Sequence, residues 1–312
     1  MRDFLVKIKP KTPFHIGEVG IGLEGSLPWV PSDLLFSAFA NAYGLLYGRA
    51  EVEALLSSFL SSPPFLVSSA FPFFENKLFF PRPLITPKLE DTKRLKDLKK
   101  MRLIPEELFK KWLSGEEFSW ETDSWDDELP RQELLPGVKL DRVNMKSQIY
   151  YRSAYFFPER GGLFFLLRLK EESLLNKIKG AFNLLGDIGI GGERSLGYGH
   201  FKVISFEETT LFPPPEADSP ILTLSLVVPS PLDDVDLESS YYQLILRGGW
   251  VNSPFVSQQV RRKAVWMLAE GSVFSRNIRG SFLDLTPEGY PHKVYRYALT
   301  FPVGVILDAE GS

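Results

Sequence analysis

Gly186-Asp-Ile-Gly189-Ile-Gly191-Gly192-Glu193-Arg194-Ser195-Leu196-Gly197-Tyr198-Gly199-His200-Phe201 is the most informative stretch of this chain, because six of the fourteen residues from 186 to 199 are glycine. Glycine adopts positive φ angles and lets other groups approach the backbone closely. An amphipathic pattern precedes the stretch and a strand-like segment follows it, so the chain runs from helix through loop to strand.

Two interpretations of this loop stay open: a clamp for a nucleic-acid backbone and a plain tight connection. A nucleotide-binding loop is excluded, because there is no Gly-Lys-Ser/Thr and because such loops run from strand to helix. We expect instead a clamp for a single-stranded nucleic-acid backbone: amides contact phosphates, Arg194 offers a planar fork, and Ser195 and Tyr198 hydrogen-bond or stack. The alternative is a plain tight connection, which normally needs only one or two glycines.

The segments around the loop predict the fold of residues 1–206. In chain order they are a strand at Phe4–Lys9, a helix at Leu34–Tyr47 with Ser32 or Asp33 as its N-cap, a hairpin of Ile149–Phe157 with Leu163–Leu169, a helix at Leu174–Leu185 and a strand at His200–Ser205. This order is that of a split βαβ, ferredoxin-like domain.

The rest of the chain is expected to form an insertion and a second domain. Residues 88–111 carry nine basic side chains and residues 116–128 carry seven carboxylates, so about 88–140 is predicted to protrude as helical fragments and a hairpin. Beyond the linker Pro213–Pro215 we predict strand Ile221–Val228, helix Val260–Glu270 and strand Val294–Val305. The predicted class is α+β, with two ferredoxin-like (RRM-like) units at 1–212 and 219–312.

Composition excludes several kinds of site. The 312 residues contain 36 Lys and Arg against 39 Asp and Glu, a net charge of −3, which excludes a wholly basic surface but leaves room for a basic groove. The absence of cysteine excludes disulfides, thiolate zinc sites and iron–sulfur clusters. With only three histidines, no metal and no cofactor is expected.

We expect no targeting segment in this sequence. Its first nine residues alternate like a strand and carry charge throughout, unlike a signal peptide. The longest apolar runs, such as Leu163–Leu167, are far short of the roughly 20 residues that span a bilayer. We therefore expect a cytoplasmic protein with no membrane contact.

The glycine-rich stretch resembles the loop that precedes the last strand in the RAMP proteins of CRISPR systems. Pro13–Glu18 and Pro31–Ala38 resemble the start of the type III-A (Csm) subunit that grips the 5′ tag of the guide RNA. Arg247–Trp250, Arg262–Val265 and Glu270–Phe274 resemble its C-terminal half. Together these segments cover most of the chain outside 88–140.

The resemblance implies an RNA-binding scaffold without catalytic activity in an antiviral effector complex. It would hold the crRNA 5′ tag and join the large polymerase-like subunit to the backbone RAMP subunit. The residues implied to line the RNA path are His15, Gly17, Ser32, Gly189, Gly191, Gly192, Glu193, Arg194, Ser195, Gly197, Tyr198, Gly199, Arg261, Arg262 and Lys263. Arg142, Lys146 and Arg152 flank the acidic excursion and are expected to meet RNA near its base.

Two other functions stay open. Related RAMP ribonucleases use a histidine against a 2′-hydroxyl, so His15 could serve a metal-independent endoribonuclease that processes CRISPR repeat RNA. No partnered tyrosine or second histidine lies near it in the sequence. A module that assembles proteins and binds no RNA is the third possibility.

Overall fold

A seven-stranded antiparallel sheet forms the centre of the molecule. The computed structural model describes residues 1–18, 25–91, 93, 95–120, 125–140 and 147–307. The strands of this sheet are β1 (Arg2–Pro10), β2 (Phe65–Val67), β3 (Phe71–Phe74), β4 (Lys77–Pro81), β5 (Leu103–Pro105), β8 (Gly161–Leu169) and β9 (Phe201–Glu208). Their order is β5-β4-β3-β8-β1-β9, and β2 also pairs with β8.

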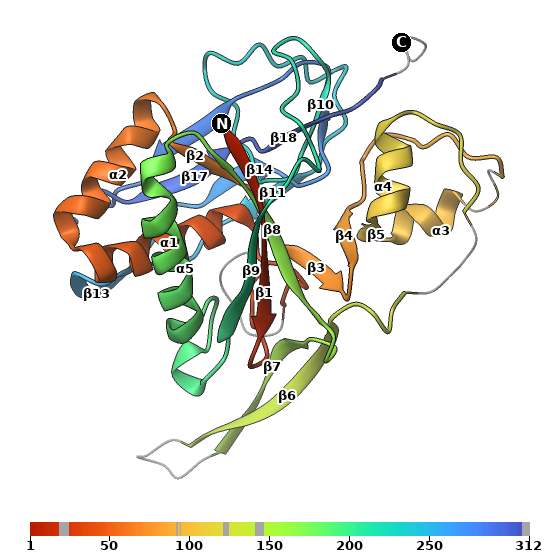
Figure 1. Cartoon of the computed structure of the whole chain (residues 1–312). Helices are drawn as coiled ribbons and strands as arrows, with labels where there is room; N and C mark the ends of the chain where they lie inside the picture. The colour runs from red at the N-terminus through yellow and green to blue at the C-terminus, as the bar shows by residue number, and fades with distance from the viewer. Residues whose placement is uncertain (19–24, 92, 94, 121–124, 141–146, 308–312) are drawn as a thin grey trace.

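Helices lie beside this sheet in two groups (Figure 1). The group that packs near β8 and β9 comprises α1 (Ser32–Tyr47), α2 (Arg49–Ser61) and α5 (Leu175–Ile188). The other group, α3 (Leu95–Lys100) and α4 (Glu106–Leu113), forms a lobe near β4 and β5. The helices expected at 34–47 and 174–185 are confirmed, whereas α2 was not predicted from the sequence.

The predicted N-cap of α1 is wrong. Pro31 occupies the N-cap position, and no side chain caps the helix there. Ser32 and Asp33 instead lie within the first turn and are buried. The hydroxyl of Ser32 accepts a hydrogen bond from the Leu226 amide at 2.9 Å, and therefore joins the helix to the C-terminal part of the chain.

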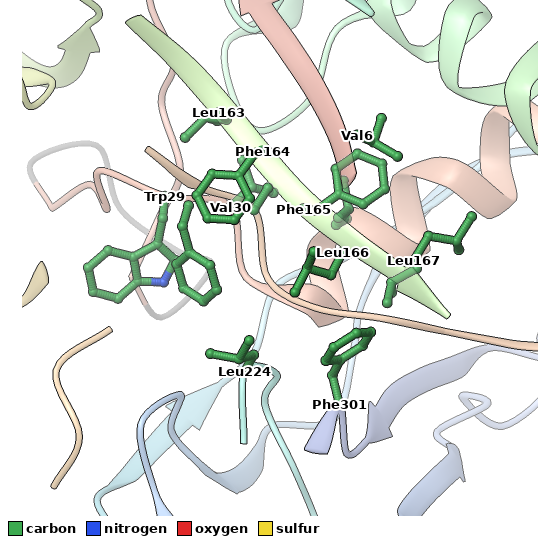
Figure 2. Packing of buried hydrophobic residues seen from close by; sticks show 14 of the residues in the cluster. Val6, Trp29, Val30, Leu163, Phe164, Phe165, Leu166, Leu167, Leu224 and Phe301 are labelled. Atoms are coloured by element: carbon green, nitrogen blue, oxygen red, sulfur yellow. The ribbon is translucent and has the colours of Figure 1, made fainter. Parts of the chain in front are cut away.

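Strand β8 is buried along its whole length because both of its faces are covered. On one face Phe165 packs against Phe182 of α5, with ring centroids 4.7 Å apart. On the other face lie Leu224 and Phe301 of the C-terminal part (Figure 2). A strand covered on both faces is apolar at successive positions, which explains the run Leu163–Leu167.

The C-terminal part consists of short antiparallel pairs. Its strands are β10 (Ile221–Thr223), β11 (Leu244–Arg247), β12 (Trp250–Ser253), β13 (Val256–Arg261), β14 (Val265–Leu268), β15 (Val273–Phe274), β16 (Gly280–Asp284), β17 (Tyr295–Leu299) and β18 (Pro302–Gly304). They pair as β15-β10-β18, β11-β14, β12-β13 and β16-β17.

The helix predicted at Val260–Glu270 is wrong, because β13 and β14 occupy this segment. Residues 213–307, all of which the structure describes, contain no helix, so the expectation of a second ferredoxin-like unit at 219–312 is corrected. The apolar run at 265–268 suits a strand as well as a helix, and its pairing with β11 decides between the two.

The hairpin predicted from Ile149–Phe157 and Leu163–Leu169 is also wrong. Strand β7 (Ser147–Phe156) pairs instead with β6 (Arg131–Leu140) in a ribbon that projects from the body (Figure 1). A turn from Pro158 to Gly161 directs β8 into the central sheet, where it pairs with β1, β2 and β3. The predicted insertion at 88–140 therefore ends inside a hairpin.

The insertion has a buried aromatic interior, although its sequence is highly charged. Phe109, Trp112 and Phe118 belong to the main hydrophobic core. Trp120 and Trp125, which lie within the acidic segment 116–128, are only 8% and 9% exposed. The aromatic residues of the insertion thus anchor it to the body, and its charges lie around this anchor.

The glycine-rich loop packs tightly against itself and against the segment after β1. Gly199 has φ +78°, and a Cβ atom there would collide with the carbonyl oxygen of Ile190. Gly191 has φ +90°, and its Cβ would collide with the carbonyl oxygen of His15. These glycines are required by packing within the protein, whatever the loop binds.

We predict that Arg168→Ala lowers the free energy of unfolding by about 3–5 kcal/mol. The buried Arg168 guanidinium donates to Asp3 at 2.8 Å and to the Phe212 carbonyl at 2.9 Å, so its loss leaves a mostly buried carboxylate unpaired. The control Arg160→Ala breaks the exposed pair with Glu75 and should cost about 0–1 kcal/mol. Urea denaturation measures both, and equal losses would contradict the role given to Arg168.

A second pair of variants tests the loop. Gly199→Ala should cost at least about 2 kcal/mol, because the backbone strain of positive φ adds to the collision with Ile190. Gly197→Ala has a similar φ of +85° but open space around it, and should cost only about 1 kcal/mol. If the two variants unfold at the same urea concentration, tight packing is not what the loop requires.

Candidate functional site

A groove of about 800 Å³ lies between α1, the glycine-rich loop and residues 247–252. It brings together three segments that are far apart in the sequence. The predicted site residues that line it are His15, Gly17, Gly189, Gly191, Gly192, Glu193, Arg194, Ser195 and Arg262. These predicted residues come from separate segments of the sequence, and the fold makes them one surface.

The other predicted site residues lie elsewhere. Ser32 is fully buried, and the described groove lining does not include Gly197, Tyr198 or Gly199. Arg261 and Lys263 are exposed beside the groove, and the Arg261 guanidinium lies 5.3 Å from the ring centroid of Trp250. Arg142 and Lys146 lie outside the described residues.

The loop offers only part of its backbone to a ligand. The amides of Gly192 and Gly199 donate to the carbonyls of His15 and Pro13, both at 2.9 Å. Within the described residues, the successive amides of Glu193, Arg194 and Ser195 have no hydrogen-bond partner. Glu193 is left-handed, with φ +56°, and a 3₁₀ turn begins at Arg194. Successive amides in this conformation form a concavity that attracts anions.

Two arginines lie at the loop, and only one of them is paired with a carboxylate of the described residues. Arg152 of β7 donates to the Glu193 carboxylate at 3.2 Å, so these two charges offset each other. Arg194 forms no ion pair with any residue that the structure describes. Burial lowers the pKa of Arg194, as expected for a cation without a counter-charge.

A buried cluster of charges forms the wall opposite the loop. The carboxylate of Asp33 accepts from Arg247 at 3.1 Å and from Arg296 at 2.9 Å. Burial alone would raise the pKa of Asp33, but the two arginines together lower it. Arg262 adds a third guanidinium near Asp33, and the buried carboxyl of Glu270, whose pKa is raised by burial, interacts with Arg247 and Asp33.

Sequence reasoning did not identify Asp33, Arg247 and Arg296 as site residues. Arg247 belongs to the segment Arg247–Trp250, which resembles the family, and no local sequence pattern marks Arg296 as a site residue. The ion pairs join residues 214 and 263 positions apart, so no local pattern can reveal them. Only the packing of α1 against the C-terminal strands brings them together.

His15 is held as part of the structure. Its Nδ1 lies 2.7 Å from the carbonyl oxygen of Ser153, and since a carbonyl oxygen only accepts, Nδ1 donates. The ring also packs against Gly192, where a Cβ atom would lie 2.7 Å from His15 Cδ2. His15 therefore links β7 to the glycine-rich loop. Arg152, on the same strand as Ser153, makes the second link, to Glu193.

The described residues form neither a metal-binding cluster nor a membrane-spanning helix. No three or more His, Asp or Glu side chains among them are arranged to hold a metal ion. None of the helices they form is both long enough and apolar enough to cross a membrane.

The sequence matches two known families. Residues 7–202 match the RAMP superfamily, and residues 216–305 match the CRISPR Csm4 C-terminal domain. "CRISPR system Cms protein Csm4" of Thermococcus onnurineus is 31% identical over 309 residues, covering 97% of this chain and 96% of the relative. The protein of the same name from Mycobacterium tuberculosis H37Rv is 33% identical over 153 residues, covering 47% and 49%.

Solved structures agree with this match. A chain of the Csm1–Csm4 cassette in complex with cA4 superposes with a TM-score of 0.68 at 26% identity, over 99% of both chains. A chain of the Csm3–Csm4 subcomplex of the type III-A interference complex superposes with a TM-score of 0.65, over 98% of this chain and 100% of that chain. At 17% sequence identity, this likeness shows a shared fold. The resemblance found in the sequence is confirmed, and the chain belongs to the Csm4 family of the RAMP superfamily.

Proposed function

We propose that this chain is a non-catalytic subunit of a type III-A CRISPR effector complex and that its groove holds the 5′ tag of the guide RNA. The observation that carries the proposal is the groove itself. On one side it has Arg194 and amides that lack a hydrogen-bond partner among the described residues, and on the other side it has a cationic cluster. Both sides suit the phosphates of a single strand. The net charge of −3 does not oppose this, because the described groove lining carries three arginines (Arg194, Arg247 and Arg262) against two carboxylates (Asp33 and Glu193).

An aromatic side chain supports binding of a single strand. Trp250 lines the groove and is 49% exposed, with Arg261 against its ring. Exposed aromatic rings next to arginine stack on unpaired bases, whereas paired bases are inaccessible to them. The groove therefore favours an unpaired segment of RNA over a duplex.

The proposed partners are the large polymerase-like subunit and the backbone RAMP subunit. The similar solved chains come from complexes named for Csm1 with Csm4 and for Csm3 with Csm4. The projecting β6–β7 ribbon supports assembly with other molecules, since a two-stranded ribbon alone is marginally stable. Its exposed apolar side chains are Leu134, Val138, Leu140, Ile149 and Tyr151.

The proposal includes a ferredoxin-like domain at residues 1–212, with residues 219–312 as a second domain packed on it. The order β9-β1-β8-β3, with α1 after β1 and α5 after β8, supports the first assignment. Such a sheet presents the loop between α5 and β9 at one end. That end faces the groove.

The endoribonuclease alternative has less support. Cleavage by general acid and base needs two groups near the 2′-hydroxyl and the leaving oxygen. Among the described residues His15 is the only histidine in the groove lining, and it is buried and held by the Ser153 carbonyl. This arrangement favours a positioning role for His15.

We expect Arg194→Glu to weaken binding of guide RNA by about tenfold or more, because it replaces an attraction to phosphate with a repulsion. Fluorescence anisotropy with labelled guide RNA measures the effect. The matched control is Arg160→Glu, which reverses an exposed charge that does not line the groove. Guide retention equal to wild type in Arg194→Glu would count against the proposal.

Incubation with CRISPR repeat RNA tests the absence of catalysis. We expect the RNA to stay intact in the presence of the purified full chain. A product ending in a 2′,3′-cyclic phosphate that disappears in His15→Ala would establish the endoribonuclease instead. Gel analysis with 3′-end identification distinguishes the two outcomes.

A further inference from the structure

A second cavity, of about 350 Å³, opens beside the groove. It lies between α1, α2, the turn that joins β12 to β13, and residues 292–295, and we call it the side cavity. Its volume falls within the range of small-molecule sites. Six residues line both the side cavity and the groove, so the two spaces adjoin: Ser37, Asn41, Val251, Asn252, Pro254 and Arg262.

The side cavity has the lining that an unstacked base requires. Phe36, Phe255 and Tyr295 supply aromatic surface. Ser253 and His292 supply polar groups, with His292 Nε2 2.7 Å from Ser253 Oγ. Bases turned out of a single strand are recognised by aromatic stacking together with hydrogen bonds to their edges. The lining therefore offers both components.

Arg262 stands at the junction of the two spaces and forms no ion pair with any residue that the structure describes. Its Nε is buried and has no hydrogen-bond partner in the described part of the chain. Its Nη2 donates to Ser37 Oγ at 3.3 Å, while the nearby carboxylate of Asp33 is bound by Arg247 and Arg296. Burial, and then the charge of Arg296, lower the pKa of Arg262 to about 10.

A buried guanidinium without an anion is unfavourable, and a bound phosphate would relieve that cost. Asp33 and the three arginines carry one negative charge and three positive charges, and burial raises the pKa of the neighbouring Glu270, which favours its neutral form. A phosphodiester brings one negative charge to it. The missing partner of Arg262 is thus an anion that enters from the groove.

We propose that the junction at Arg262 binds one nucleotide of the strand, with its phosphate on the guanidinium and its base turned into the side cavity. This inference rests on the proposed function, because it requires single-stranded RNA in the groove. It adds that one nucleotide is separated from its neighbours. Since Arg262 lines both spaces, a phosphate held there places the attached nucleoside at the cavity entrance.

The test uses the full chain and guide-tag RNAs that carry one 2-aminopurine, scanned along the strand. Ser57 is exposed on α2 and lines the side cavity but not the groove, so Ser57→Trp obstructs the cavity from a tolerant position. We expect this variant to change 2-aminopurine emission at one position only, with affinity for the strand reduced less than about threefold. A change at no position, or an equal change at all positions, would overturn the inference.

A second pair of variants tests the phosphate contact. Arg262→Gln should weaken RNA binding by about tenfold or more and remove the position-specific emission. It also removes repulsion with Arg296, so the fold should persist, and thermal unfolding checks this. The control Arg276→Gln alters an arginine that pairs with Asp234 and lines neither space, and it should leave the emission pattern intact. Equal effects of the two variants would contradict the assignment.

These measurements separate the two proposals. If the wild-type chain binds none of the RNAs, the proposed function fails and this inference fails with it. If the RNAs bind and no position has distinct emission, the inference alone is wrong.

Discussion

The carboxylate of Asp33 joins the N-terminal helix to the C-terminal strands. It lies in the first turn of α1, where the helix dipole favours a negative charge, and it pairs with Arg247 and Arg296 from two strands of the other half. Buried charges are costly unless they are paired, so the three side chains are stable only together. The position of α1, and with it one wall of the groove, depends on these ion pairs.

The glycine-rich loop serves the fold first and a ligand second. Gly191 and Gly199 are needed because neighbouring carbonyl oxygens occupy the space of a Cβ atom. The part that faces the groove is shorter, from Gly189 to Ser195. A run of glycines in a sequence thus overstates the length of backbone that a ligand can reach, because internal packing requires some of the same glycines.

Elements with a strong local pattern were predictable. The helices α1 and α5 follow from apolar side chains at helical spacing, and β1 follows from alternation. The partner of β7 was not predictable. The turn at Pro158 lies between β7 and β8, and a turn there is compatible with a β7–β8 hairpin or with β8 entering another sheet. Pairing with β6 decides the outcome for β7. The strand β14 was not predictable either, because its apolar residues form a strand only through pairing with β11.

The sequence by itself determined the family, the glycine-rich loop with Arg194, and the absence of cysteine chemistry, since each of these is a matter of residue type and order. Only the tertiary structure decided how three adjacent basic residues divide their roles. Arg262 lines the groove and the side cavity, whereas Arg261 and Lys263 are exposed beside them. The physical reason is that a site is defined by distances between remote segments, and those distances are established when α1 packs against the C-terminal strands.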